Sequence, residues 1–401
     1  MTTSAERLTS VEICAGAGGQ AIGLHDAGFR HLALVEIDGH AATALKKNVE
    51  KRRGWEWERK NKVVHELDVN KFFPKDHLPD IEPFDVDLLA GGVPCPPFSL
   101  AGHQLGQDDE RDLFPRMLDL VREISPKAVM IENVRGLLQP EHKFAGYRKE
   151  IISELEELGY HVCNWGMVEA ADYGVPQLRP RAILIAIHRE FYFEEFEWPS
   201  GDLERKTVFE ALRKSMEERY RHAEELHKNK KAALQNAHQK WKERAERHGV
   251  APTLVGGSKK HGGADLGPSR AKAAWKLLGV DAMGVANDMG DDINVDRDLL
   301  CEAGPKLTVA QAAIIQGFPE NWHFEGGKTA RYRQIGNAFP PPVAKAFGES
   351  IAKVLRLGKR PEGEVPASFS STISDGAGDG AGAGLRGLVL PESENNPPSL
   401  F

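Results

Sequence analysis

Residues 12–29 read EICAGAGGQAIGLHDAGF, and this stretch decides the fold class. It begins inside an apolar, strand-like run, passes through Gly16, Gly18 and Gly19, and continues into a helical pattern. A glycine-rich turn between a strand and a helix lets the backbone approach a ligand closely and leaves the first N–H groups of the helix free. Such a turn is a weak signal by itself, so its meaning depends on the segments that follow.

The same alternation of strand-like and helical patterns continues to about Ile187. Strands are predicted at residues 10–15, 32–38, 62–69, 86–92, 127–133 and 181–187. Helices are predicted between them at residues 19–28, 40–50, 113–124 and 147–159. Strands that alternate with helices are typical of an α/β fold in which a mostly parallel sheet is covered on both faces.

The chain as a whole divides into four parts by sequence character. Residues 1–190 carry the α/β pattern. Residues 191–304 begin with a long, charged helical segment and then mix glycine with basic residues, whereas residues 305–357 return to compact helical patterns. Residues 358–401 are rich in glycine, alanine, serine and aspartate without apolar periodicity, so we expect a disordered tail.

Composition is that of an ordinary globular protein. Of the 401 residues 41% are hydrophobic. The net charge of −7 does not by itself indicate nucleic-acid binding, although a local basic region can bind nucleic acid on a chain of negative net charge. The four cysteines are far apart and form no CxxC pair, which argues against a disulfide framework or a metal site. No segment is apolar for long enough to cross a membrane and the start lacks a signal-peptide pattern, so we expect a cytoplasmic protein.

Two acidic residues end strands at the same edge as the glycine turn. Glu36 ends the second predicted strand and Asp68 ends the third. Ligands of open α/β sheets bind at the carboxyl ends of the strands, where an acidic side chain can accept the hydroxyl groups of a ribose. Either acid alone is more simply a solvent-facing loop residue, but together with the glycines they predict a nucleoside site.

A cysteine in a proline-rich loop follows the fourth predicted strand. The sequence GGVPCPPFS, residues 91–99, surrounds Cys95 with Pro94, Pro96 and Pro97, which fix the backbone angle φ and lack N–H donors. A stiff loop of this kind suits a nucleophile better than a packing residue. The other cysteines are interpreted as small buried hydrophobic residues: Cys14, Cys163 and Cys301.

Charged side chains are placed at the same edge by two further segments. IENVRG puts Glu132 at the end of the fifth predicted strand, and a thiol and a carboxyl group that face one cavity suit nucleophilic attack coupled to proton donation. QLRPRA supplies Gln177, Arg179 and Arg181. The two arginines stand at alternate positions and therefore share one face of a strand, where they could hold a carboxylate, a phosphate or a carbonyl oxygen.

These motifs resemble the DNA (cytosine-5)-methyltransferase family, of the bacterial restriction–modification type. The resemblance covers about residues 9–188 and 305–357 and includes PCPPFS, ENV, QLRPR and RQIGNAFPPPVAKAFG in the family's usual order. It implies a Rossmann-like, S-adenosylmethionine-dependent methyltransferase sheet with an inserted, smaller target-recognition domain. It also implies that the substrate is a cytosine flipped out of a specific duplex DNA sequence.

The resemblance implies a role for each catalytic residue. Cys95 would add as a thiolate to C6 of the cytosine, which makes C5 able to attack the methyl group of the donor. Glu132 would protonate N3 of the cytosine. Arg181 would contact the cytosine carbonyl and orient Glu132, and Arg179 would face a DNA phosphate or support the pocket.

The resemblance also assigns the cofactor site. Gly16, Gly18 and Gly19 would lie under the methionine moiety, with the ribose at Glu36 and the adenine amine at Asp68. Further cofactor contacts are expected from Cys14, Ile37, Val69, Pro94, Asn337 and Ala338. The family usually has phenylalanine where Cys14 stands, and a cysteine offers the adenine ring less contact.

The region 191–304 takes the place of the family's variable target-recognition domain. Its loop GGSKKHGGADLGPSR, residues 256–270, combines glycines with basic side chains that can reach phosphate groups or guanine edges. DNA contacts are expected from Ser99, Gln177, Lys259, Lys260, His261 and Arg270. The family usually has glutamine where Pro96 stands, so one polar DNA contact is absent here.

Two alternatives stay open at this point. One branch of the family methylates tRNA, but the large inserted region and the absence of that branch's usual cysteine-containing insert argue against this activity. A non-catalytic DNA-binding relative would be expected to lack Cys95 or Glu132, and both are present. The expected partners are duplex DNA, which would hold the enzyme at the nucleoid, and a restriction endonuclease that cuts the same site.

Overall fold

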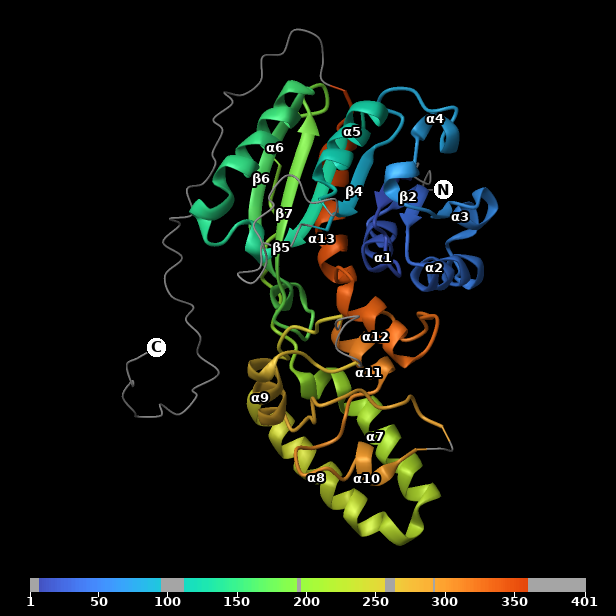
Figure 1. Ribbon diagram of the computed structural model, residues 1–401, viewed down its shortest axis with the longest axis vertical. Helices are drawn as coiled ribbons and strands as arrows, with labels where there is room; N and C mark the ends of the chain where they lie inside the picture. The colour runs from blue at the N-terminus through green and yellow to red at the C-terminus, as the bar shows by residue number, and fades with distance from the viewer. Residues whose placement is uncertain (1–6, 95–111, 193–195, 257–263, 291–292, 360–401) are drawn as a thin grey trace, which may run out of the picture.

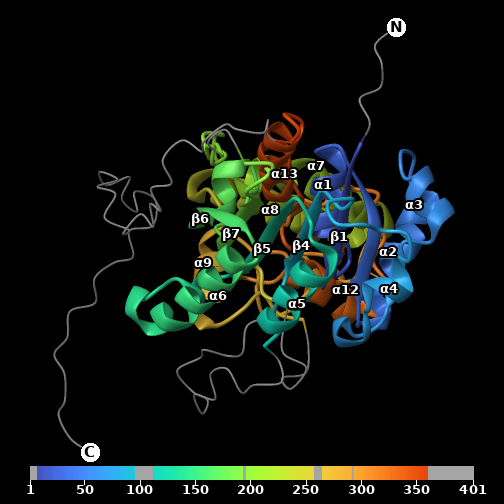
Figure 2. The same cartoon turned by 90° about the horizontal axis from the view of Figure 1, so that it is seen from above.

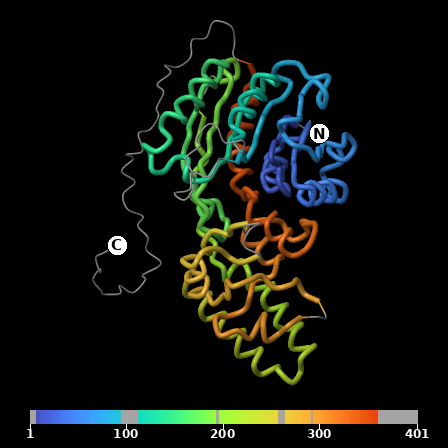
Figure 3. Tube along the Cα trace, in the orientation of Figure 1, coloured from blue at the N-terminus to red at the C-terminus, as the bar shows by residue number. Residues whose placement is uncertain are grey.

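The computed structural model describes residues 7–94, 112–192, 196–256, 264–290 and 293–359. A sheet with helices on both faces forms the upper part of the molecule in Figure 1, and a helical part lies below it. The tube in Figure 3 shows that the chain leaves the upper part after the sheet, builds the lower part, and returns to the upper part near its end.

The described residues form one seven-stranded sheet. Its strands are β1 (Leu8–Ile13), β2 (Phe29–Glu36), β3 (Val64–Glu66), β4 (Leu88–Gly92), β5 (Ala128–Val134), β6 (Tyr160–Glu169) and β7 (Pro180–His188). The order across the sheet is β3-β2-β1-β4-β5-β7-β6. Strand β7 runs antiparallel to both β5 and β6, whereas all other pairs are parallel. The predicted α/β class with a mostly parallel sheet is confirmed.

Two layers of helices cover the sheet. The helices of this part are α1 (Gly19–Asp26), α2 (Gly39–Lys51), α3 (Glu56–Asn61), α4 (Pro74–His77), α5 (Phe114–Ile124), α6 (Ala145–Glu157) and α13 (Pro341–Leu355). Leu88 and Ala90 of β4 pack in one core cluster with Phe347 of α13, whereas Leu89 packs in another with Met117 of α5. Alternate residues of a strand point to opposite faces, so α13 and α5 lie on opposite sides of the sheet, as Figure 2 shows.

The edge strands depart from the sequence prediction. Strand β6 was not predicted, because most of its residues are half-buried and mixed in polarity rather than apolar. Strand β3 has three residues where the pattern predicted eight, at 62–69. An edge strand has one neighbour and partly faces solvent, so it does not need the continuous apolar run by which the central strands were recognised.

The charged segment predicted as one long helical stretch is a pair of helices. Helices α7 (Val208–Leu226) and α8 (Lys231–His248) fold back on each other through a short turn (Figure 1). Each has a buried stripe, and Tyr220 of α7 stacks on His238 of α8 with ring centroids 4.6 Å apart. One continuous helix would expose both stripes to water, so burial of the stripes favours the turn.

Shorter helices complete the lower part and the return to the sheet. They are α9 (Ser269–Leu277), α10 (Val295–Asp298), α11 (Val309–Ile315) and α12 (Lys328–Asn337). Helix α11 begins with a capping box, in which Thr308 Oγ1 accepts from Gln311 N and the Gln311 side chain accepts from Thr308 N. Within residues 305–357, where compact helical patterns were predicted, the chain forms α11, α12 and α13.

A buried histidine lies beneath the glycine turn. His31 on β2 is 0% exposed; its Nε2 donates to Ala21 O at 3.1 Å, and its Nδ1 lies 2.9 Å from Ser10 Oγ, which can donate to a neutral ring. Burial lowers its pKa from 6.5 to about 4, although the nearby Glu58 opposes the shift. The folded state therefore disfavours the proton that the unfolded chain accepts below about pH 6.5.

This histidine predicts a loss of stability in mild acid. The contribution of neutral His31 to the free energy of unfolding is complete above about pH 6.5 and is lost as the pH falls toward 4, a loss of about 3 kcal/mol at most. In His31→Gln the slope of that free energy against pH should be smaller across this window, as measured by urea unfolding at each pH. The exposed His40→Gln is the control and should keep the wild-type slope; parallel curves for His31→Gln and wild type would contradict the account.

Candidate active site

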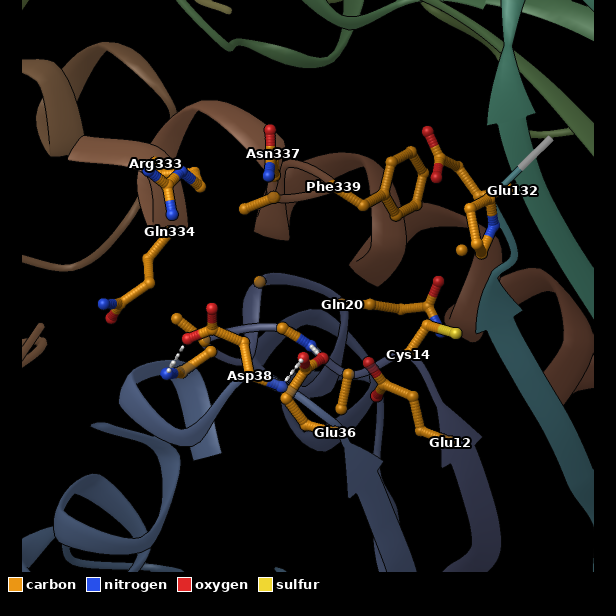
Figure 4. A pocket seen from close by; sticks show the side chains of 18 of the residues that line it. Glu12, Cys14, Gln20, Glu36, Asp38, Glu132, Arg333, Gln334, Asn337 and Phe339 are labelled. Atoms are coloured by element: carbon orange, nitrogen blue, oxygen red, sulfur yellow. Dashed lines mark hydrogen bonds between the residues drawn. The ribbon is translucent and has the colours of Figure 1, made fainter. Parts of the chain in front are cut away.

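A cavity of about 330 Å³ opens at the carboxyl ends of β1, β2, β4 and β5. Its walls come from the glycine turn, the tips of these strands, the start of α2 and one face of α12 (Figure 4). Ligand pockets in proteins typically measure about 300–1,000 Å³. Position and size therefore fit a small-molecule site of the kind that the sequence predicted at this edge.

The glycine turn shapes one wall of the cavity. Gly16 has φ +55, and a Cβ placed on it would meet nothing within 4 Å, so this glycine keeps the turn geometry and leaves space open. Gly19 serves packing, because its Cβ would lie 2.3 Å from Phe339 O. Gly18 also serves packing, because a Cβ on it would lie 2.7 Å from the Leu45 side chain, and it does not line the cavity.

Glu36 is held at the cavity by backbone donors. Its Oε2 accepts from Gly16 N and its Oε1 accepts from Asp38 N, both at 2.7 Å (Figure 4). Burial raises the pKa of Glu36, and the two N–H groups act in the opposite direction. A carboxylate has about four lone-pair sites, so both oxygens can still accept from the hydroxyl groups of a ligand.

Glu12 and Gln20 are among the polar side chains at the cavity that the sequence prediction missed. Glu12 of β1 is 1% exposed, its Oε2 has no hydrogen-bond partner among the described residues, and burial raises its pKa well above the usual range. Gln20 of α1 is 3% exposed, and both polar atoms of its amide likewise lack partners in the described part of the chain. Glu12 lies one residue before the end of β1, and an acidic residue in a buried strand that leads into the glycine turn was the signal that could have identified it.

Cys14 also lines the cavity rather than packing in the core. It is half-buried, has φ 53, and burial raises the pKa of its thiol to about 12, with Glu36 and Glu12 acting in the same direction. It is therefore protonated at neutral pH and is not a nucleophile. Its interpretation as a small buried hydrophobic residue is corrected to that of a cavity-lining thiol.

The predicted cofactor residues fall into two groups. The cavity is lined by Cys14, Gly16, Gly19, Glu36, Pro94, Asn337 and Ala338. The lining does not include Gly18, Ile37, Asp68 and Val69. Asp68 instead accepts from Asn70 N at 2.9 Å and Ile37 is 68% exposed, so their contacts with an adenine remain predictions.

Glu132 and Arg181 form an ion pair at one end of the cavity. Arg181 Nε lies 2.7 Å from Glu132 Oε1, and the two side chains are 12% and 13% exposed. Arg181 opposes Val134 in the antiparallel pairing of β7 with β5, which brings its side chain toward Glu132. Gly92 leaves room here, because a Cβ on it would lie 2.9 Å from Glu132 Oε2.

The proline-rich loop begins at this cavity. Pro94 lines it and directly precedes Cys95 in the chain. The predictions for Cys95 and Ser99 lie outside the described residues, as do those for Lys259, Lys260, His261 and the tail from residue 360. Gly256, which leads into the predicted DNA loop, packs on the cavity wall, since a Cβ on it would lie 1.9 Å from Asn337 Oδ1.

Arg179 has a structural position. It is 1% exposed and donates from Nη1 to Leu254 O at 2.7 Å and from Nη2 to Gly336 O at 2.8 Å and Ala338 O at 3.0 Å. The expectation that Arg179 faces a DNA phosphate is therefore wrong for this conformation. Its bonds to the backbone near the cavity support the other expectation, that it holds the pocket wall.

Gln177 also differs from its assignment. It is 0% exposed; its amide donates to Gln316 Oε1 at 2.7 Å and its Oε1 accepts from Leu254 N at 2.7 Å. Assignment of Gln177 to DNA is corrected, because a side chain with both polar atoms bonded in the interior does not reach a phosphate or a base. By contrast, Arg270 is exposed at the start of α9, and its contact with DNA remains a prediction.

The comparisons with known proteins decide the family. Residues 8–353 match the family described as C-5 cytosine-specific DNA methylase. The chain belongs to this family. It is 48% identical over 360 residues to the type II methyltransferase M.NaeI of Lentzea aerocolonigenes, covering 88% of this chain and 76% of that protein. It is 46% identical over 354 residues to M.NgoMIV of Neisseria gonorrhoeae, covering 87% of this chain and 99% of that protein.

Solved structures share the fold. A putative DNA modification methyltransferase encoded within an Escherichia coli prophage has a TM-score of 0.55 at 22% identity and covers 87% of this chain and 99% of its own. The Spodoptera frugiperda DNMT2 mutant has a TM-score of 0.54 at 14% identity, with the same coverage. At these identities the likeness concerns the fold alone. It confirms the Rossmann-like methyltransferase fold, and the family match confirms the predicted enzyme class.

Enzymes of this family use S-adenosylmethionine, and the cavity fits that cofactor. The unpartnered oxygen of Glu12 and the unpartnered amide of Gln20 offer polar atoms that a ligand can satisfy. Gly16 leaves open space at the turn, and Glu36 has free lone pairs for a ribose.

Among the described residues, no group of three or more His, Cys, Asp or Glu side chains is arranged to hold a metal ion. None of the described helices is both long and apolar enough to span a membrane.

Proposed function

We propose that this chain methylates C5 of a cytosine flipped out of a specific duplex DNA sequence, through a covalent bond between Cys95 and C6. The observation that carries the proposal is the Glu132–Arg181 ion pair at the end of the cavity where the proline-rich loop begins. Glu36 and the glycine turn would hold the ribose and the methionine arm of S-adenosylmethionine, which supplies the methyl group when bound. Base flipping is required because a stacked ring hides both of its faces.

Each side chain has one task in this reaction. The Cys95 thiolate adds to C6, and the electron pair of the C5–C6 double bond moves toward N3, where Glu132 delivers a proton. C5 then has enamine character and would take the methyl group from S-adenosylmethionine, whose bond between sulfur and the methyl group would break to leave S-adenosylhomocysteine. Loss of the C5 proton to water and departure of Cys95 restore the aromatic ring. Arg181 keeps Glu132 in place through their 2.7 Å contact and can donate to the cytosine carbonyl.

We infer that residues 191–304 form the target-recognition region, within the proposed division 1–190, 191–304 and 305–357. Gly256 packs on Asn337, so the chain that leads into the loop 256–270 starts beside the cavity. Arg270 is exposed at the first turn of α9. A cognate restriction endonuclease is part of the proposal because the relatives with the highest identity above are named type II methyltransferases.

Methylation mapping tests the proposal. The chain would be expressed in a bacterial host that lacks cytosine-5 methylation, and modified cytosines would be located by sequencing. Modification of one cytosine in one recurrent duplex sequence is expected. Methyl incorporation into tRNA but not into duplex DNA would favour the tRNA alternative, and incorporation into neither substrate would favour a non-catalytic relative.

The recognition loop gives a salt-dependent prediction. If Lys259 and Lys260 contact phosphate groups, neutralising both should lower the log–log slope of DNA affinity against salt by about 0.9 per lost contact. Binding to all sequences should weaken alike, and the methylated sequence should not change. The control is Lys345→Ala, Lys353→Ala on exposed positions of α13, which should keep the wild-type slope. An unchanged slope and affinity in Lys259→Ala, Lys260→Ala would remove the loop 256–270 from the interface.

A further inference from the structure

Arg333 lines the cavity, and its positive charge has no ion-pair partner among the described residues. Helix α12 turns Ala330, Arg333, Gln334 and Asn337 toward the cavity, at the spacing of one helix face (Figure 4). Within the described part of the chain, the Arg333 guanidinium makes no hydrogen bond or ion pair, and its Nε is buried without a partner. Arg331, two positions earlier, instead binds Asp288 through Nη1 at 2.8 Å.

The charges around Arg333 favour an anionic group on the ligand. Among the described lining residues, Arg333 is the one lysine or arginine, whereas Glu12, Glu36, Asp38 and Glu132 are acidic. The sulfonium and ammonium groups of S-adenosylmethionine are positive and suit acidic surroundings. Its single anionic group is the α-carboxylate of the methionine arm, and that group suits a half-buried guanidinium.

The shape of the cofactor points to the same end of the cavity. Three arms leave the sulfonium: the methyl group, the ribose side and the methionine side. The methyl group has to face Glu132, where the base is proposed to bind, and the ribose has to face Glu36. In Figure 4, Arg333 and Gln334 lie at the end of the cavity away from Glu132, across from Asp38. The direction that remains for the methionine arm is toward the face of α12 that carries Arg333.

We propose that Arg333 binds the α-carboxylate of the methionine arm and thereby selects S-adenosylmethionine over adenosyl ligands without that group. This inference rests on the proposed cofactor site. A guanidinium can donate two parallel N–H bonds to the two carboxylate oxygens, and such a pair is directional and short. The Gln334 amide does not compete for the carboxylate, because it already donates to Glu325 O at 2.8 Å and accepts from Glu325 N at 3.3 Å.

Cofactor binding without DNA tests this role directly. Isothermal titration would compare S-adenosylmethionine with decarboxylated S-adenosylmethionine, which keeps the sulfonium and the amine, on wild type and Arg333→Ala. The variant should lose about 10- to 100-fold in affinity for S-adenosylmethionine, as expected for a charge-assisted pair. Its affinity for the decarboxylated ligand should stay the same or rise, because a positive charge has been removed near a positive ligand.

Matched variants separate this role from folding. Arg331→Ala removes a neighbouring guanidinium from the same helix and should leave the preference between the two ligands unchanged. Arg333→Lys keeps the charge without the planar pair of donors and should recover part of the affinity for S-adenosylmethionine. Thermal melting would confirm that each variant is folded.

Three outcomes would count against the proposals in different ways. Equal losses for both ligands in Arg333→Ala, or no loss for S-adenosylmethionine, would overturn the role of Arg333. Unchanged cofactor binding with weaker DNA binding would also overturn it and identify Arg333 as a phosphate contact. If the wild type bound neither ligand, the proposed function itself would fail.

Discussion

Cys95→Ser is expected to reduce methyl transfer by about 10⁴-fold or more, the largest effect of any single substitution in this chain. A thiol is a few per cent thiolate at neutral pH, whereas a serine hydroxyl is hardly ionised and an alkoxide is therefore far scarcer. The measurement is single-turnover methyl transfer to the duplex sequence found by methylation mapping. Cofactor affinity should be retained, because Cys95 is not required to hold the cofactor.

The control for Cys95→Ser is another cysteine of the same chain. Cys163 lies half-buried on β6, and burial raises the pKa of its thiol to about 12, so it is protonated at neutral pH. Cys163→Ser should keep nearly the wild-type rate. Methyl transfer by Cys95→Ser at close to the wild-type rate would contradict the covalent mechanism.

Glu132→Gln is expected to lower the single-turnover rate by about 10²–10⁴-fold, the usual contribution of a positioned general acid. Glutamine keeps the shape of the side chain and an oxygen for Arg181 but has no proton to deliver to N3. DNA affinity should change little, because the pair lies inside the cavity rather than at the surface. The rate and the dissociation constant would be measured on the same duplex.

A carboxylate outside the cavity provides the matched comparison. Glu66 ends β3 at the same edge of the sheet, is exposed and pairs with Lys46 at 3.4 Å. Glu66→Gln should leave the rate nearly unchanged. If Glu132→Gln behaved like Glu66→Gln, Glu132 would serve only as a structural partner of Arg181.

The central part of the fold could be predicted because its physical signals are local. Strands β1, β2, β4, β5 and β7 are apolar runs buried on both faces, and the glycine turn between β1 and α1 has its own sequence signature. The edge strand β6 and the turn between α7 and α8 could not be predicted in the same way. Both depend on which neighbour covers a half-buried face, and that is decided by tertiary packing.

The candidate site was predictable where a motif fixes a side chain at a strand end. Glu36 and Glu132 are in the cavity for that reason. Sequence spacing did not reveal that Gln177 and Arg179 turn inward, because their partners, the backbone near Leu254 and Gly336, are far away in the chain. Arg333 was missed although Asn337 on the same helix was predicted, because the motif alone does not show which other residues of α12 face the cavity.

The covalent attack by Cys95 is the central claim, and trapping tests it most directly. Duplex DNA with 5-fluorocytosine at the target position would be incubated with the enzyme and S-adenosylmethionine, and the adduct would be mapped by peptide mass spectrometry. Fluorine cannot leave C5 as a proton does, so the reaction should stop with the enzyme attached to C6. The account predicts one adduct, on the peptide that contains Cys95. An adduct on Cys14, Cys163 or Cys301, or methylation of natural DNA with no adduct on the fluorinated duplex, would contradict it.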